Sequence, residues 1–330
     1  MKTTESKRPV FVVGSARSGT TLLYHMLLSA GGFAVYRAET HAFDLVGPSF
    51  GDLRRRRTRE KLMDAWLKTH LFERSGLEAD QIRARVLAEC RTVGDFLRIH
   101  MESIAEKQGV DRWADCTPAH LLYMTSIKSL IPDAQFIHII RDGRDVALSL
   151  AKTGWIKPLP WDSGRRLAIA ALYWEWFVSR GRAAGLGLGD DYIEIHFEQL
   201  VTEPRVALAS VGEFIHQDLD YEVIRQVGIG SVSKPNTSFP EDSRGSGPSS
   251  AVGRWKQRLS AEQVQYFDLL IGPCLSELGY ELRSVDAPLR TPVALHALKR
   301  LYHAYFSTKH WVRSNTPLGR VLVDIHSLDR

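Results

Sequence analysis

The sequence is poor in cysteine. Cys90, Cys116 and Cys274 are the three cysteines among 330 residues, and their spacing matches no metal-ligand motif, so no metal is expected. A small, odd number of cysteines argues against a disulfide framework and favours a reducing compartment. Long apolar runs are missing too. A signal peptide needs about 7–15 consecutive apolar residues and a membrane span about 20, and the sequence has no run of either kind. We therefore expect a cytoplasmic protein.

The sequence also lacks a strong excess of either charge. Its 43 Lys and Arg residues and 38 Asp and Glu residues give a net charge of +5. This mild excess fits an anionic ligand but does not indicate a protein that coats nucleic acid. Because 44% of the residues are hydrophobic, a large core can form. No repeat or linker divides the chain convincingly, so we predict one domain over residues 1–284 and a C-terminal helical appendage over 285–330.

Apolar runs that suit strands alternate with helical patterns along the chain. Strands are predicted at residues 9–13, 113–115, 134–140 and 192–195, and helices at 22–28, 52–74, 80–108, 118–132, 146–152, 163–184, 204–216 and after Ser260. This alternation predicts an α/β fold, a three-layer α/β/α domain around a central parallel sheet. The stretch 231–253, rich in Ser, Gly and Pro, is predicted to be a long loop, and loops of this length are usually lids, binding loops or disordered segments.

The first strand leads into a loop that suits an anion. The segment 14–21 fits the pattern G-x-x-x-x-G between Gly14 and Gly19, and a helix follows it. Backbone N–H groups at a helix N-terminus bind phosphate-like groups, and glycines permit their close approach. Thr20 stands where nucleotide triphosphatases carry a Lys, and the cation is Arg17 instead. The alternative is a Gly-rich turn that only packs helix against strand.

A second anion motif follows the strand at 134–140. Arg141 stands at the carboxyl end of this strand, where ligands bind in open α/β sheets. Ser149 lies about two helical turns further on. A guanidinium and a hydroxyl in this arrangement can hold a phosphate together. The alternative is local pairing of Arg141 with Asp142 or Asp145.

The two motifs together resemble those of sulfotransferases that use 3′-phosphoadenosine 5′-phosphosulfate (PAPS), among them bacterial, carbohydrate and tyrosylprotein sulfotransferases. The resemblance covers residues 9–282 and implies a P-loop-like fold. It also implies transfer of a sulfuryl group from PAPS, without a metal, to a hydroxyl of a small molecule, a carbohydrate or a lipid. It assigns the 5′-phosphosulfate to Arg17, Ser18, Gly19, Thr20 and Thr21, and the 3′-phosphate to Arg141 and Ser149. The segment 253–256 resembles a cofactor-covering segment and adds Arg254, Trp255, on which the adenine would stack, and Lys256.

The catalytic base is assigned by the same resemblance. Glu39-Thr40-His41-Ala42-Phe43-Asp44 is similar to the Glu-x-His-x-Phe-Asp run of carbohydrate sulfotransferases, in which the Glu is the base. Glu39 is therefore the expected base, at the end of an expected second strand, and Arg17 the cation that stabilises the sulfonate. His41 is the rival base, because imidazole titrates near neutral pH.

One position departs from the family. Trp113-Ala114-Asp115-Cys116-Thr117-Pro118 looks like the family segment W-G-D-K-T-P, with Cys116 in place of the Lys. We expect Cys116 to be a small buried hydrophobic residue. Then either another cation (Arg17, His41 or His120) takes the role of the Lys, or activity is weak, or the segment functions differently.

Two other functions remain open from the sequence: a kinase of related P-loop architecture that uses Mg-ATP, and a non-catalytic nucleotide- or membrane-binding protein. The helix expected over 291–313 carries aromatic and basic residues. It suits packing on the domain or on a second subunit, as in a homodimer, which we favour, or peripheral contact with a membrane surface.

Overall fold

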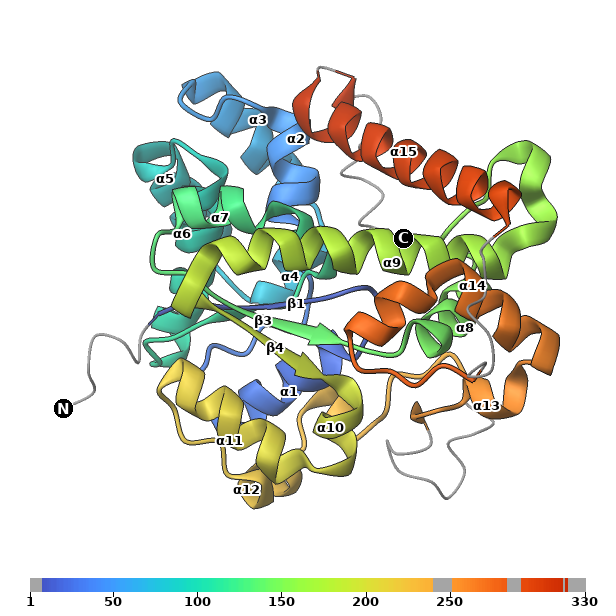
Figure 1. The fold of residues 1–330 in the computed structure, drawn as a ribbon. Coiled ribbons are helices and arrows are strands. Elements are labelled where there is room, and N and C mark those ends of the chain that lie inside the picture. Colours follow the sequence, from blue (N-terminus) through green and yellow to red (C-terminus); the bar gives the residue numbers. More distant parts are fainter. Residues whose placement is uncertain (1–7, 240–250, 284–291, 317, 320–330) are drawn as a thin grey trace.

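Four parallel strands form the centre of the computed structural model, which describes residues 8–239, 251–283, 292–316 and 318–319. Their order in the sheet is β2-β1-β3-β4, and the first strand lies between the second and third (Figure 1). The strands are β1 (Val10–Val13), β2 (Ala114–Asp115), β3 (Gln135–Ile140) and β4 (Tyr192–His196).

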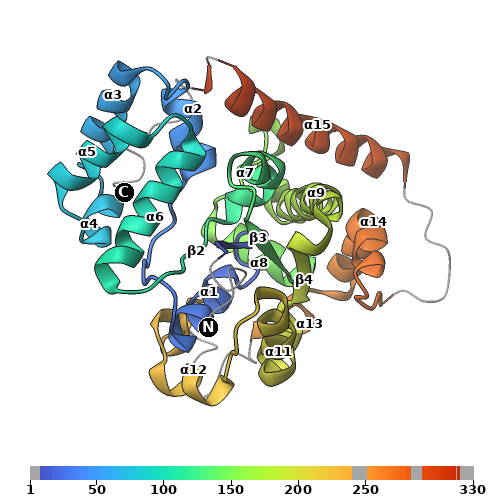
Figure 2. The ribbon, with the colours of Figure 1, turned by 90° about the vertical axis from the view of Figure 1, so that its left-hand side faces the viewer.

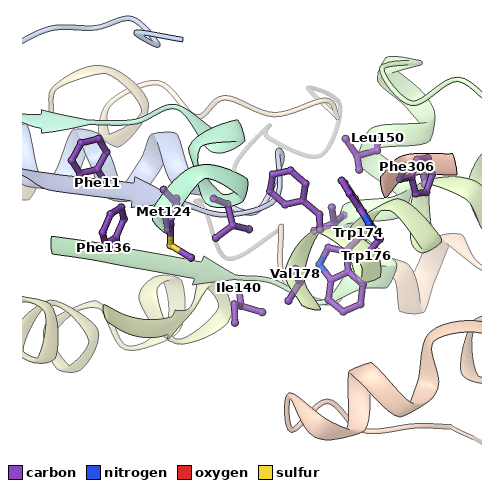
Figure 3. Packing of buried hydrophobic residues seen from close by; sticks show 14 of the residues in the cluster. Phe11, Met124, Phe136, Ile140, Leu150, Trp174, Trp176, Val178 and Phe306 are labelled. Atoms are coloured by element: carbon purple, nitrogen blue, oxygen red, sulfur yellow. The ribbon is translucent and has the colours of Figure 1, made fainter. Parts of the chain in front are cut away.

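Both faces of this sheet are buried, which explains why its central strands are continuous apolar runs. In β1, Phe11 belongs to one hydrophobic cluster, while its neighbours Val10 and Val12 belong to the cluster on the other face. In the pairing of β1 with β3, Phe11 stands opposite Phe136, and their rings stack with centroids 5.3 Å apart. Figure 3 shows the first of these clusters, which continues to Phe306 near the C-terminus.

Helices cover the two faces as separate layers (Figures 1 and 2). On one side lie α8 (Gly143–Thr153), α9 (Arg166–Gly185) and α14 (Ala261–Glu277), with α15 (Val293–Asn315) packed on the outside of α9. On the other side lie α1 (Thr20–Ala30), α10 (Phe197–Thr202), α11 (Pro204–Ile215) and α12 (Tyr221–Val227). The three-layer α/β/α fold with a central parallel sheet is therefore confirmed.

The remaining elements include a lobe of helices with its own core around Trp66 and Phe96. The lobe consists of α2 (Gly47–Phe50), α3 (Arg56–Trp66), α4 (His70–Ser75), α5 (Ala79–Glu89) and α6 (Val93–Gln108). Short elements connect the layers: η2 (Ala42–Val46), η3 (Pro118–Tyr123), α7 (Met124–Leu130), η4 (Pro160–Arg165), η5 (Leu186–Asp191), η6 (Gly230–Val232) and α13 (Trp255–Arg258).

The long helices expected over 52–74 and 80–108 are each divided in two. The Thr69 hydroxyl accepts a hydrogen bond from the Phe72 N–H and starts α4 as a separate helix. Thr92 and Asp95 form a capping box that starts α6. Capping residues satisfy the free N–H groups of a new first turn, so they outweigh the apolar periodicity that continues across the break.

The C-terminal helix α15 packs on the domain rather than standing apart. Tyr302 and Phe306 are buried, and the Phe306 ring lies 5.6 Å from that of Trp176 on α9. The Trp176 indole N–H donates to the Ser307 hydroxyl at 2.9 Å. The predicted boundary at 284/285 and the first residue of the helix expected over 291–313 lie outside the described residues. No helix in the described parts of the chain has both the length and the apolar composition that crossing a membrane requires.

Truncation of the buried ring on α15 tests this packing. Phe306→Ala should lower the free energy of unfolding by about 3 kcal/mol or more, because it removes a buried aromatic ring and leaves a cavity. Trp311→Ala on the same helix is the matched control, since Trp311 is 58% exposed, and its effect should stay within about 0.5 kcal/mol. Chemical denaturation measures both values, and equal effects would show that α15 is not part of the cooperative fold.

Candidate functional site

The loop between β1 and α1 has the backbone shape that its glycines permit. Gly19, the N-cap of α1, has φ 97°, and a Cβ added there would lie 2.3 Å from the Phe197 ring. Arg17 has φ 73°, a left-handed conformation that is unfavourable for a residue with a side chain. The hydroxyl oxygen of Ser18 is buried and has no hydrogen-bond partner among the residues that the structure describes. The loop therefore presents a helix N-terminus, a cation and a free hydroxyl in one turn, as an anion site requires.

The structure brings the two sequence motifs together. Arg141 follows β3 directly, and its Nη1 donates to the carbonyl oxygen of Arg17 at 3.0 Å. Arg17 Nε in turn donates to the hydroxyl of Ser149, on α8, at 3.0 Å. The contact arises because the carboxyl ends of parallel neighbouring strands meet at one edge of the sheet. Arg17, Arg141 and Ser149 thus form one cluster.

This cluster carries positive charge that the protein compensates only partly. Burial, together with the nearby charge of Arg141, lowers the pKa of Arg17. Burial also lowers the pKa of Arg141, although Asp145, at 3.7 Å, opposes this effect. Among the described residues, Arg141 Nε is buried without a hydrogen-bond partner, and no carboxylate forms an ion pair with Arg17. An anion bound here would stabilise the charged form of both guanidinium groups.

The segment predicted to cover the cofactor lies beside this cluster. The carboxylate of Asp145 accepts hydrogen bonds from the N–H groups of Gly253 and Trp255, at 2.9 and 2.8 Å. The Trp255 ring is buried, and the guanidinium of Arg144 lies 3.7 Å from its centroid, so one face is already stacked. Arg254 is buried, whereas Lys256 is exposed. Adenine stacking on Trp255 remains a prediction.

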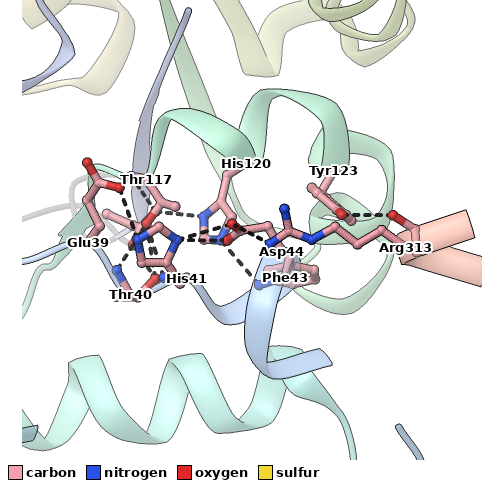
Figure 4. Close-up of polar contacts among 11 residues, drawn as sticks. Glu39, Thr40, His41, Phe43, Asp44, Thr117, His120, Tyr123 and Arg313 are labelled. Atoms are coloured by element: carbon pink, nitrogen blue, oxygen red, sulfur yellow. Dashed lines mark hydrogen bonds and ion pairs between the residues drawn. The ribbon is translucent and has the colours of Figure 1, made fainter. Parts of the chain in front are cut away.

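The segment that carries Glu39 is not the end of a strand, and that expectation is wrong. The chain makes one isolated bridge, between Phe33 and Arg112, and then runs as irregular structure to η2. Glu39 is 45% exposed in its side chain, and its carboxylate lies 3.2 Å from His41 Nε2. His41 Nδ1 lies 3.1 Å from the buried carboxylate of Asp44 (Figure 4). The imidazole therefore stands between two carboxylates.

A network of buried hydrogen bonds holds the segment that carries Glu39 in place. The Thr40 hydroxyl donates to Asp115 Oδ2, and the Thr40 N–H donates to the Thr117 hydroxyl at 3.0 Å. His120 Nδ1 lies 2.7 Å from Asp115 Oδ1. The predicted helix over 118–132 begins instead as the 3-10 helix η3, and the Thr117 hydroxyl before it belongs to this network. Asp115 thus orients the Glu39 segment through Thr40 and Thr117.

Cys116 is buried, as expected for a small hydrophobic residue. Burial raises the pKa of its thiol well above the ordinary value, and the charges of Glu39 and Asp115 raise it further. A hydrogen bond with Thr20 opposes the shift and connects the thiol to the first turn of α1. Cys116 is therefore a neutral thiol between Glu39 and the loop, and it supplies no positive charge.

His41 forms an ion pair with Glu39. Burial alone would lower the pKa of the imidazole, but Asp44 and Glu39 together outweigh this effect and raise it to about 10. His41 also has φ 50°, and of the three non-glycine residues with positive φ in the described chain, Arg17 and His41 both belong to this site. Such strained residues concentrate at functional sites.

The sequence did not reveal the full extent of this cluster. Arg313, on α15, lies 3.6 Å from Asp44, so the C-terminal helix reaches the Glu39 segment (Figure 4). Charges on His41, His120 and Arg313 outweigh the effect of burial and lower the pKa of Asp44. Asp44 stood in the Glu-x-His-x-Phe-Asp run, but no sequence signal connected it with Arg313.

The protonation of His41 can be measured directly. We expect its ring protons to titrate near pH 10 in an NMR titration, far above an ordinary imidazole at about 6.5. Because the folded pKa is raised, the stability that His41 contributes is fully present below pH of about 6.5 and is lost as the pH rises through about 10. The difference in unfolding free energy between wild type and His41→Gln should shrink over this range. Titration near pH 6.5 would contradict the prediction.

Comparisons with known proteins bear on the family and the fold of the chain. The family model described as "Sulfotransferase family" matches residues 9–221, more than half of the chain. The sulfotransferase domain from the curacin biosynthetic pathway superposes with a TM-score of 0.53 at 15% identity, over 83% of this chain and 98% of that chain, which shows a shared fold. The sulfotransferase domain of the Synechococcus PCC 7002 olefin synthase gives 0.49 at 17% identity, over 89% and 94%. STF9 from Mycobacterium avium gives 0.44 at 15%, over 83% and 78%. No curated protein matches the chain.

Proposed function

Because the chain belongs to the sulfotransferase family, we propose that it transfers the sulfuryl group of PAPS to a hydroxyl of a small-molecule, carbohydrate or lipid acceptor. The observation that carries this proposal is the cluster in which Arg141 donates to the Arg17 carbonyl and Arg17 donates to Ser149. Two anion motifs separated by more than a hundred residues meet there. A donor with two separate anionic groups needs such an arrangement.

The residues present fit such a donor. The buried Ser18 hydroxyl and Arg141 Nε have no partners within the described structure, and an anionic oxygen would satisfy both. We assign Arg17, Ser18, Gly19, Thr20 and Thr21 to the 5′-phosphosulfate, and Arg141 and Ser149 to the 3′-phosphate. Arg254, Trp255 and Lys256 would cover the nucleotide. When bound, the donor supplies a sulfuryl group on a phosphate leaving group, and the acceptor oxygen bonds to sulfur as the sulfur–oxygen bond to that phosphate breaks.

Glu39 is the base in this proposal. Its carboxylate is partly exposed and can accept the proton of an acceptor hydroxyl. His41, with its pKa raised to about 10, already holds a proton at neutral pH and cannot act as a base. Its positive charge instead orients the Glu39 carboxylate. It also takes the place of the positive charge that the family segment has on the Lys at the position of Cys116. Arg17 and the N–H groups at the start of α1 stabilise the negative charge that develops on the sulfonate and leaving phosphate.

Nucleotide binding tests the donor assignment. We expect adenosine 3′,5′-bisphosphate to raise the melting temperature in a thermal-shift titration, and AMP to do so only at much higher concentration. Arg141→Ala should reduce this preference about tenfold or more, since it removes a charged hydrogen-bond donor. If Arg141→Ala does not fold, Ser149→Ala tests the same 3′-phosphate assignment with a smaller change, because it removes only a hydroxyl. It should also reduce the preference for adenosine 3′,5′-bisphosphate over AMP. Stabilisation by Mg-ATP alone would favour a kinase and refute the proposal.

Turnover tests the base. Glu39→Gln keeps the size of the side chain but cannot take a proton, so turnover should fall by about 100-fold or more. Binding of adenosine 3′,5′-bisphosphate should be unchanged, because Glu39 lies outside the nucleotide cluster. His41→Gln is the companion variant, and it should retain more turnover than Glu39→Gln. The reverse order would assign the proton transfer to His41.

A further inference from the structure

A cavity of about 270 Å³ lies between α9, η3, the segment 155–157 and α15. The helix α15 forms one wall, and it lies beyond residue 221, where the match to the family model ends. Figures 1 and 2 both show α15 running along the outside of α9. This wall is therefore a feature of this chain rather than of the matched family region.

The cavity is connected to both groups that the proposed reaction uses, in each case through residues of its wall. Trp155 lines it, and the Arg17 guanidinium lies 5.6 Å from the centroid of the Trp155 ring. Asp44 also lines it and lies 3.1 Å from His41, which in turn contacts Glu39 at 3.2 Å. Figure 4 shows Glu39, His41, Asp44 and Arg313 in one row that leads from the proposed base to α15. A molecule in the cavity thus contacts Trp155, which lies against the Arg17 guanidinium, and Asp44, which leads through His41 to Glu39.

The walls of the cavity are mostly aromatic. Tyr173, Trp176 and Phe177 come from α9, and Tyr305 and Phe306 come from α15. Aromatic walls suit a flat apolar molecule, because ring faces and edges pack against each other with large contact area. The volume is slightly below the range of about 300–1,000 Å³ typical of drug-sized ligands, so the occupant is small.

The charges in the cavity are mainly positive. Lys157, Lys309 and Arg313 line it, against the single carboxylate of Asp44. That carboxylate is buried and already contacts His41 and Arg313. Lys157 and Lys309 are exposed, and neither forms an ion pair with a carboxylate in the parts of the chain that the structure describes. Two ammonium groups are therefore left to attract a negative charge at the cavity.

We infer, building on the function proposed above, that this cavity binds the acceptor, and that the acceptor is a small aromatic alcohol that carries an anionic group such as a carboxylate. The aromatic walls hold its ring, and Lys157 and Lys309 recognise its negative charge. The acceptor hydroxyl then points toward Glu39, at the other end of the row that starts at Arg313. Neutral alcohols and alcohols with a positive charge would bind more weakly.

The first experiment compares two probes that differ only in charge, 6-hydroxy-2-naphthoate and its neutral amide, 6-hydroxy-2-naphthamide. Isothermal titration calorimetry on the full chain without nucleotide should show about tenfold tighter binding of the carboxylate, the expected effect of two partly exposed cations. Equal affinities, tighter binding of the amide, or no binding of either probe would overturn the inference.

The second experiment locates the preference. The double variant Lys157→Gln/Lys309→Gln should bind the two probes with nearly equal affinity. Arg300→Gln is the matched control, because Arg300 is an exposed cation on α15 that does not line the cavity, and this variant should keep the wild-type preference. Equal loss of affinity for both probes in the double variant, or the same loss of preference in the control, would contradict charge recognition at the cavity.

Adenosine 3′,5′-bisphosphate binding separates this inference from the proposed function. The double variant should bind this nucleotide like wild type, since neither Lys belongs to the nucleotide cluster. Failure of wild type to bind it would overturn the proposed function, whatever the naphthoate result. Normal nucleotide binding without a preference for the carboxylate probe would overturn only the acceptor class.

Discussion

The close placement of two guanidinium groups, on Arg17 and Arg141, is the constraint on which the site depends. Parallel strands end at one edge of the sheet, so the loop after β1 and the residue after β3 must meet. Their mutual repulsion and burial are unfavourable without an anion, and the left-handed backbone at Arg17 adds to this cost. Hydrogen bonds to the Arg17 carbonyl and to Ser149 hold the arrangement in place.

In the other half of the site, around Glu39, neighbouring charges have opposite signs. Carboxylates at Glu39 and Asp44 enclose the imidazole of His41, and Arg313 ends the row. Charges of alternating sign stabilise one another here, so this half needs no ligand for charge balance. In the proposed function the first half binds the donor's anionic groups, and the second takes a proton from the acceptor. Cys116, neutral and buried, lies between the two halves.

The parts that could be predicted from sequence are local or follow from strand order. Buried parallel strands are continuous apolar runs, so β1 and β3 were visible, and with them the loop that carries Arg17 and the position of Arg141. Contacts between distant segments were not visible. Thr40 depends on Thr117 and Asp115, and Asp44 depends on Arg313 of the last helix, so no local pattern revealed them. The breaks before α4 and α6 were missed because capping residues outweighed periodicity.

The helix α15 has a consequence for how this protein could diverge from its relatives. Tyr302 and Phe306 anchor the helix on the domain, and Lys309 and Arg313 follow them further along the same side of the helix, at the cavity. Substitution of Lys309 leaves the sheet and the loop around Arg17 untouched, whereas Arg313 also pairs with Asp44 in the charged row. If α15 recognises the acceptor as inferred, a few changes on one terminal helix can exchange one acceptor for another while the sulfuryl donor stays the same. Evolution and protein engineering then have a route to new specificity that avoids the strained, charged centre.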